Sequence, residues 1–174
     1  MSAQLLATMI PYTLLGDFAV SKSLGDYYIY TLQALGVGDF LGRLFTGPIL
    51  QYLFIDPIWF YVTSQGVCAL LILLFLTTVN GIQLVVQAFL FGITYGSQAV
   101  LMTLVPREIF GAANLNTIYG LSMFFGGAGI FIGPPMAGLL LDLTSSYLAV
   151  FILSGVSECI SAVCILSMFL LSKK

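Results

Sequence analysis

Long apolar stretches, separated by short segments rich in polar residues, proline or glycine, make up almost the whole chain. About 20 helical residues cross the hydrocarbon core of a bilayer, and five of the stretches reach or exceed that length. The pattern predicts one partial and five full membrane spans. Their predicted ranges are 3–20, 27–53, 58–78, 82–105, 114–141 and 147–171.

The stretches show no alternation of apolar and polar residues, so helices are the only spanning element that fits them. The connections between them are very short, which makes consecutive helices antiparallel neighbours and leaves no room for a soluble domain. The predicted fold class is therefore an all-α membrane protein. It forms a single bundle of about six transmembrane helices over residues 1–174.

The composition agrees with a location in the lipid bilayer. Hydrophobic residues make up 60% of the chain and charged residues 7%, whereas soluble domains have roughly 25% charged residues. The mean hydropathy is +1.09. Such a composition excludes a nucleic-acid-binding surface and disorder.

Metal and enzyme chemistry receive no support from the residue types. The chain has no histidine, and its three cysteines lack the spacing of metal ligands, so we predict that they are small buried side chains. No nucleophile–base pair supports an intramembrane enzyme. We therefore expect no enzyme activity, no cofactor and no metal.

The few basic residues predict an orientation. With six crossings, Arg107 and the Lys173-Lys174 tail fall on one side of the membrane and Lys22 on the other. Because cytoplasmic loops carry an excess of Lys and Arg, the C-terminus is predicted to be cytoplasmic.

Glycine and proline lie inside the predicted spans. Three glycine pairs have the spacing that lets helices approach closely, at 38/42, 92/96 and 129/133. Pro134 and Pro135 predict a kink in the fifth span, with a gating hinge as the alternative interpretation.

The strongest chemical signal is the pair Asp39 and Arg43 in the middle of the second span. Each charge costs roughly 2.5–3.5 kcal/mol on insertion scales, and ionisable groups there indicate a functional site. Four residues apart, the two lie on one helix face. Arg43 offers a fork that matches a carboxylate, and Asp39 can exchange a proton. We predict that the pair binds an organic anion and a proton; a purely structural ion pair is the alternative.

Three further residues are candidates. Tyr95 and Gln98 share a face of the fourth span with Phe91 and Met102, and this face is predicted to line a substrate cavity, with ordinary packing as the alternative. Glu158 is an additional intramembrane acid in the last span. It either pairs with a group on another helix or faces a cavity.

Three motifs in order resemble the C-terminal half of the monocarboxylate transporters, a branch of the major facilitator superfamily. The first is Asp-x-x-x-Arg at residues 39–43. The second is FGITYG at residues 91–96, with Tyr95 where the family has a Phe-type selectivity residue. The third is Gly-Pro-Pro at 133–135, followed by Gly138 and Asp142. Together they cover essentially the whole chain.

The resemblance implies proton-coupled symport of monocarboxylates such as lactate or pyruvate. By it, Arg43 binds the carboxylate, Tyr95 is at the selectivity position, and Asp39 takes part in proton coupling, whereas Gln98 is a substrate-binding candidate only through the face it shares with Tyr95. It also implies a plasma-membrane location, a missing N-terminal transporter half as partner and a single-span ancillary membrane protein as a further partner.

Two departures from the family pattern bear on the substrate. Arg43 is followed by Leu44 where well-known members have proline, and Tyr95 replaces phenylalanine. Two other interpretations stay open. The chain could be a truncated, non-transporting membrane protein that partners or regulates a full-length transporter, or part of a major facilitator for a different organic solute.

Overall fold

The computed structural model describes residues 2–22, 24–111 and 115–172, and in these ranges it contains helices and no strands. The α-helices are α1 Ser2–Ser21, α2 Tyr28–Leu53, α3 Pro57–Leu74, α4 Gly81–Phe110, α5 Leu115–Thr144 and α6 Tyr147–Ser172. Two 3-10 turns, η1 Gly25–Tyr27 and η2 Phe75–Thr77, lie beside α2 and α3. The predicted all-α class is confirmed.

Four helical segments are long and apolar enough to cross a membrane: 57–77, 81–110, 115–144 and 147–169. Helix α2, with 26 residues, is about 39 Å long, which also exceeds the hydrocarbon thickness. Its hydropathy is lowered by Asp39, Arg43 and several glycines. The chain is an integral, multi-pass membrane protein.

Helix α4 is longer than the predicted fourth span, which ended at residue 105. It continues through Pro106 and ends at Phe110. Proline removes one backbone N–H donor, but transmembrane helices tolerate it because neighbouring groups satisfy the freed carbonyl. The helix ends where Gly111 adopts a φ of 78° and its N–H bonds the Arg107 carbonyl oxygen at 3.0 Å. The α5 helix likewise runs unbroken through Pro134 and Pro135.

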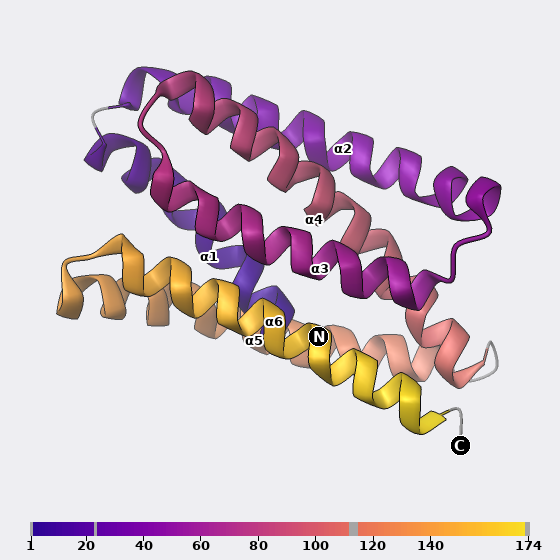
Figure 1. The fold of residues 1–174 in the computed structure, drawn as a ribbon. Coiled ribbons are helices and arrows are strands. Elements are labelled where there is room, and N and C mark those ends of the chain that lie inside the picture. Colours follow the sequence, from indigo (N-terminus) through magenta and orange to yellow (C-terminus); the bar gives the residue numbers. More distant parts are fainter. Residues whose placement is uncertain (1, 23, 112–114, 173–174) are drawn as a thin grey trace.

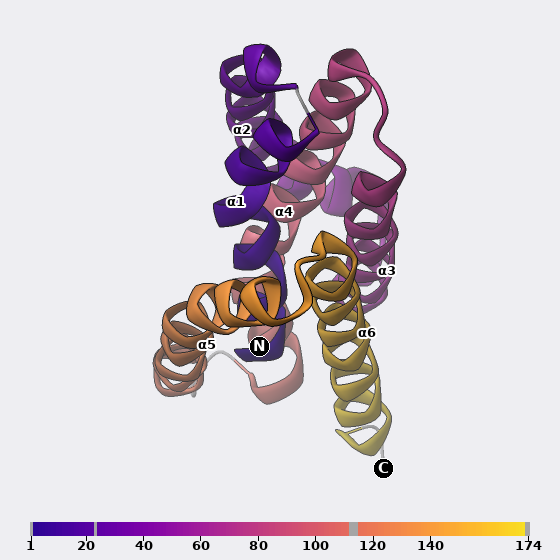
Figure 2. The ribbon, with the colours of Figure 1, turned by 90° about the vertical axis from the view of Figure 1, so that its left-hand side faces the viewer.

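Helices α2, α3 and α4 form one group and α1, α5 and α6 form another, and the two groups meet mainly where α3 packs against α6 (Figure 1, Figure 2). Helix α2 lies along α4, and α3 packs against both α4 and α6. Helix α1 packs against α5 and α6. Helix α5 ends and α6 begins at a short connection, and away from this connection the two helices diverge (Figure 2). This arrangement leaves one face of α2 and much of α5 uncovered by the bundle.

The closest helix crossing is between α2 and α4. Gly38 and Gly42 on α2 face Gly92 and Gly96 on α4, and all four are buried. A Cβ atom at any of them would meet a backbone carbonyl oxygen of the opposite helix. The prediction that these two glycine pairs make helix–helix contacts is confirmed. The two backbones are thus locked in one register.

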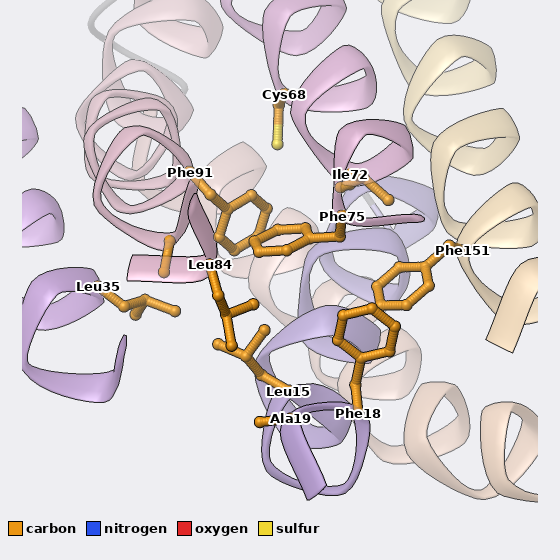
Figure 3. Packing of buried hydrophobic residues seen from close by; sticks show 11 residues of the cluster. Leu15, Phe18, Ala19, Leu35, Cys68, Ile72, Phe75, Leu84, Phe91 and Phe151 are labelled. Carbon is orange, nitrogen blue, oxygen red and sulfur yellow. The ribbon is translucent and has the colours of Figure 1, made fainter. Parts of the chain in front are cut away.

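An aromatic row holds the two groups together (Figure 3). Phe18 of α1 contacts Phe151 of α6 with ring centroids 5.2 Å apart. Phe151 stacks on Phe75 of η2 at 6.1 Å, and Phe75 meets Phe91 of α4 at 6.0 Å. All four rings are fully buried, and aromatic pairs at these separations add to the stabilisation from burial. The row fixes how α4 and α6 are turned toward α1 and α3.

Candidate functional site

The Asp39–Arg43 pair forms as the spacing predicts. Arg43 Nε donates to Asp39 Oδ1 at 2.9 Å within α2. The pair is less buried than its apolar surroundings in the sequence indicate, since the side chains are 50% exposed for Arg43 and 24% for Asp39. The reason is the glycine face. Gly38 and Gly42 point at α4, so positions 39 and 43 lie at the edge of that contact.

Asp39 has α4 directly behind it. A Cβ at Gly96 would lie 3.0 Å from Asp39 Oδ1, and a Cβ at Gly92 would lie 3.0 Å from the Asp39 backbone nitrogen. Because Gly92 and Gly96 have no side chains, there is room for Asp39 and its carboxylate against α4. Only the Nε–H of Arg43 is engaged in the pair, so the rest of its five-donor guanidinium is open to a ligand.

Tyr95 of α4 lies near this pair. The next residue, Gly96, packs against Asp39, so Tyr95 is on the turn of α4 that meets this part of α2. Its ring stacks on Phe91 with centroids 6.4 Å apart, and it meets Tyr12 of α1 at 6.0 Å. The structure therefore brings Tyr95 together with the two charged residues, in a partly buried position.

Gln98 is not brought to Arg43. It points to the other side of α4, where its Nε2 donates to Glu158 Oε1 of α6 at 2.9 Å. Its Oε1 accepts from Gln4 Nε2 of α1 at 3.0 Å. The Nε2 group of Gln98 also donates to the Ser64 carbonyl oxygen of α3 at 3.4 Å. The common face predicted for Gln98 and Tyr95 is thus divided. Tyr95 lies toward the ion pair and Gln98 toward the interior.

Glu158 is fully buried. Of the two alternatives that the sequence left open, the structure shows the first, a partner on another helix, and that partner is Gln98. Tyr61 of α3 donates to Gln4 Oε1, so hydrogen bonds connect α6, α4, α1 and α3. We call Gln4, Tyr61, Gln98 and Glu158 the interior network.

Sequence reasoning missed Gln4 and Tyr61, together with a neighbouring pair in which Gln65 Nε2 donates to Ser161 Oγ at 3.1 Å. The available signal was a glutamine inside an otherwise apolar helix, which needs a partner in lipid. The cysteines need a correction. Cys68 is buried as predicted, but Cys159 and Cys164 are exposed.

An apolar cavity of about 310 Å³ lies among α3, α4, α5 and α6. Its described lining includes Tyr61, Pro106, Ser122 and Phe125, and none of the lining residues is charged. The lining that the structure describes thus has no basic side chain to pair with a carboxylate. Within the described ranges there is also no group of three metal-ligating side chains. The ion pair with Tyr95 therefore remains the candidate site for an organic anion.

Comparison with known proteins places this geometry in a family. The Major Facilitator Superfamily matches residues 1–174. Monocarboxylate transporter 2 of Mus musculus is 31% identical over 160 residues, covering 86% of this chain and 32% of the relative. Monocarboxylate transporter 12 of Homo sapiens is 29% identical over 166 residues, covering 91% and 30%. Monocarboxylate transporter 4 of Gallus gallus reaches 40% over 79 residues, covering 45% and 17%.

The chain spans about one third of the length of the curated relatives that match most of it. The resemblance that the three motifs predict is confirmed by these matches. Since the family match covers every residue, the chain belongs to the Major Facilitator Superfamily.

Proposed function

We propose that the chain forms part of a proton-coupled symporter of monocarboxylates such as lactate or pyruvate. The observation that carries the proposal is the Asp39–Arg43 pair, held at 2.9 Å on α2, accessible on one side and flanked by Tyr95. The similarity to monocarboxylate transporters supports the same substrate class.

The pair has a charge balance that suits symport. In the empty site, the Asp39 carboxylate and the Arg43 guanidinium sum to zero. When Asp39 takes a proton, it no longer competes for the guanidinium, and an incoming carboxylate pairs with Arg43 instead. The loaded site again has no net charge. An uncompensated charge is costly inside the membrane. The empty state and the fully loaded state are both neutral, so each can open to either side of the membrane. A state that holds only the proton or only the anion carries a net charge and cannot.

The remainder of the site comes from outside this chain. Transporters of this kind bind substrate near the midplane between two repeats. The open side of the ion pair then faces an N-terminal half, and the other proposed partners are the lipid bilayer and a single-span ancillary membrane protein. We place the protein in the plasma membrane with a cytoplasmic C-terminus, in line with Arg107 on the same side.

Uptake of radiolabelled lactate under an inward proton gradient tests the function. The chain is expressed alone and joined to the N-terminal half of a monocarboxylate transporter, with surface expression measured in both. We expect uptake by the joined form, competition by pyruvate and no competition by uncharged lactamide. Uptake that lactamide inhibits equally, or that is independent of the proton gradient, would refute the proposal.

Tyr95 is expected to set the size of the substrate. Replacing Tyr95 with alanine removes a large ring beside Arg43, so uptake of bulky aromatic monocarboxylates should rise several-fold relative to lactate. A change in a hydrophobic contact of this size is worth about 1–3 kcal/mol in selectivity. Tyr30→Ala is the matched control, because Tyr30 is 61% exposed on α2. Equal selectivity of both variants would contradict this role.

A further inference from the structure

Within the described ranges, the interior network contains an acid, Glu158, that has no basic side chain beside it. Glu158 has no exposed surface. Helix α6 packs against α1 and α3, and Gln98 brings α4 to the same carboxyl group. An unpaired carboxylate in such a place would carry the full cost of a buried charge.

The basic side chains of the described ranges are engaged or lie elsewhere. Arg43 bonds Asp39 on the other side of α4. Lys22 is exposed and lies 5.8 Å from the centre of the Phe18 ring, and Arg107 is exposed near the end of α4. In this part of the chain, Arg43 forms an ion pair with Asp39, and Glu158 forms none.

Among the described residues, the titratable side chains that face Glu158 also bring no positive charge. They are Tyr61 and Cys68, both buried and both on α3. The acids on the helices that pack around it are Asp17 on α1, Glu108 on α4 and Asp142 on α5, and all three are exposed. The described side chains that face Glu158 are thus neutral.

The hydrogen bonds are uneven between the two carboxyl oxygens. Oε1 accepts from Gln98, whereas Oε2 is buried and has no partner among the described residues. Gln65 Oε1, also buried, is the other described acceptor without a donor. Gln65 lies in the same α3–α6 contact as Glu158. Its Nε2 donates to Ser161, which is one helical turn after Glu158 on α6. An O–H group on Glu158 is the kind of donor that this contact lacks.

We propose that Glu158 is a buried proton-binding site, occupied as a neutral carboxylic acid whose Oε1 accepts from Gln98 and whose Oε2 carries the proton. This site is separate from Asp39, to which the proposed function assigns the coupled proton. Loss of the proton would leave a bare charge among α1, α3, α4 and α6. The protonation of Glu158 and the packing of these four helices are therefore linked.

Infrared spectroscopy of the chain in lipid vesicles at neutral pH tests this directly, because a protonated carboxyl has its own C=O stretch. The chain has two glutamates, Glu108 and Glu158, so glutamate labelled with ¹³C at the carboxyl narrows the assignment without a mutation. We expect a protonated-carboxyl band that shifts with the label. It should persist in Glu108→Gln, whose side chain is exposed, and disappear in Glu158→Gln.

The labelled wild type and Glu108→Gln decide the question even if Glu158→Gln fails to fold. A missing band at neutral pH, a band that ignores the glutamate label or one lost in Glu108→Gln would overturn the proposal. The spectra are recorded in sodium buffer and in buffer with choline in place of sodium. A band that appears only in choline would also overturn the proposal, because Glu158 would then bind sodium rather than a proton. None of these results depends on lactate transport, so failure here is distinct from failure of the proposed function.

Discussion

Replacing Arg43 with alanine is expected to lower proton-driven lactate uptake about 100-fold or more in the joined transporter. Truncating one partner of a hydrogen-bonded charge pair costs about 2–5 kcal/mol at a binding site, and about 2.7 kcal/mol corresponds to 100-fold. Arg43 also holds Asp39 at 2.9 Å, so the substitution removes both the anion-binding fork and the partner of the proton site.

Two further variants separate charge from geometry. Arg43→Lys keeps the positive charge but loses the bidentate fork, so uptake should recover only in part. Asp39→Asn stays uncharged at every pH, so any remaining uptake should no longer follow the proton gradient. Initial rates are measured at several external pH values and corrected for surface expression. Normal pH-driven uptake by both Arg43→Ala and Asp39→Asn would rule out the assigned roles.

Replacing Gly42 with alanine is expected to lower the free energy of unfolding by about 1–3 kcal/mol, the usual cost of overpacking. The added Cβ would meet the Ile93 carbonyl oxygen of α4, which is backbone and cannot rotate away. Separation of α2 from α4 would also shift Asp39, because Gly96 packs against it. Both stability and lactate uptake should fall.

The same helix supplies a matched control. A Cβ at Gly36 has no atom within 4 Å, so Gly36→Ala meets no obstacle. Alanine favours a helix over glycine by about 1 kcal/mol, and this variant should be as stable as the parent or more so. Unfolding in a detergent titration measures both. Equal stability of Gly36→Ala and Gly42→Ala would show that the α2–α4 contact is not as close as described.

The helices and the ion pair could be predicted because they depend on local features. Spans follow from runs of apolar residues, and the Asp39–Arg43 bond follows from a spacing of four on one helix. The spacing of the glycine pairs also predicted a close helix crossing, but it did not predict which two helices cross. Hydropathy alone placed the end of the fourth span at Pro106, because it does not register that a helix in lipid can continue through proline.

The interior network could not be predicted because it depends on how each helix is turned. Gln98 and Tyr95 are three residues apart, yet the glycine contact with α2 directs them to different neighbours. The way in which α4 is turned about its axis also brings Gln98 to Glu158, and the way in which α2 is turned places Asp39 at the edge of the bundle. Sequence reasoning singled out Gln98 and Glu158 but not Gln4 and Tyr61, because the members of the network lie on four different helices.

The most direct test of the central claim is whether lactate carries protons through this protein. Vesicles containing the joined transporter enclose a pH-sensitive dye, and lactate is added outside at equal internal and external pH. We expect rapid internal acidification that scales with lactate influx, and in Asp39→Asn only the slow rate seen in protein-free vesicles. Lactate influx without acidification, or undiminished acidification in Asp39→Asn, would contradict the account.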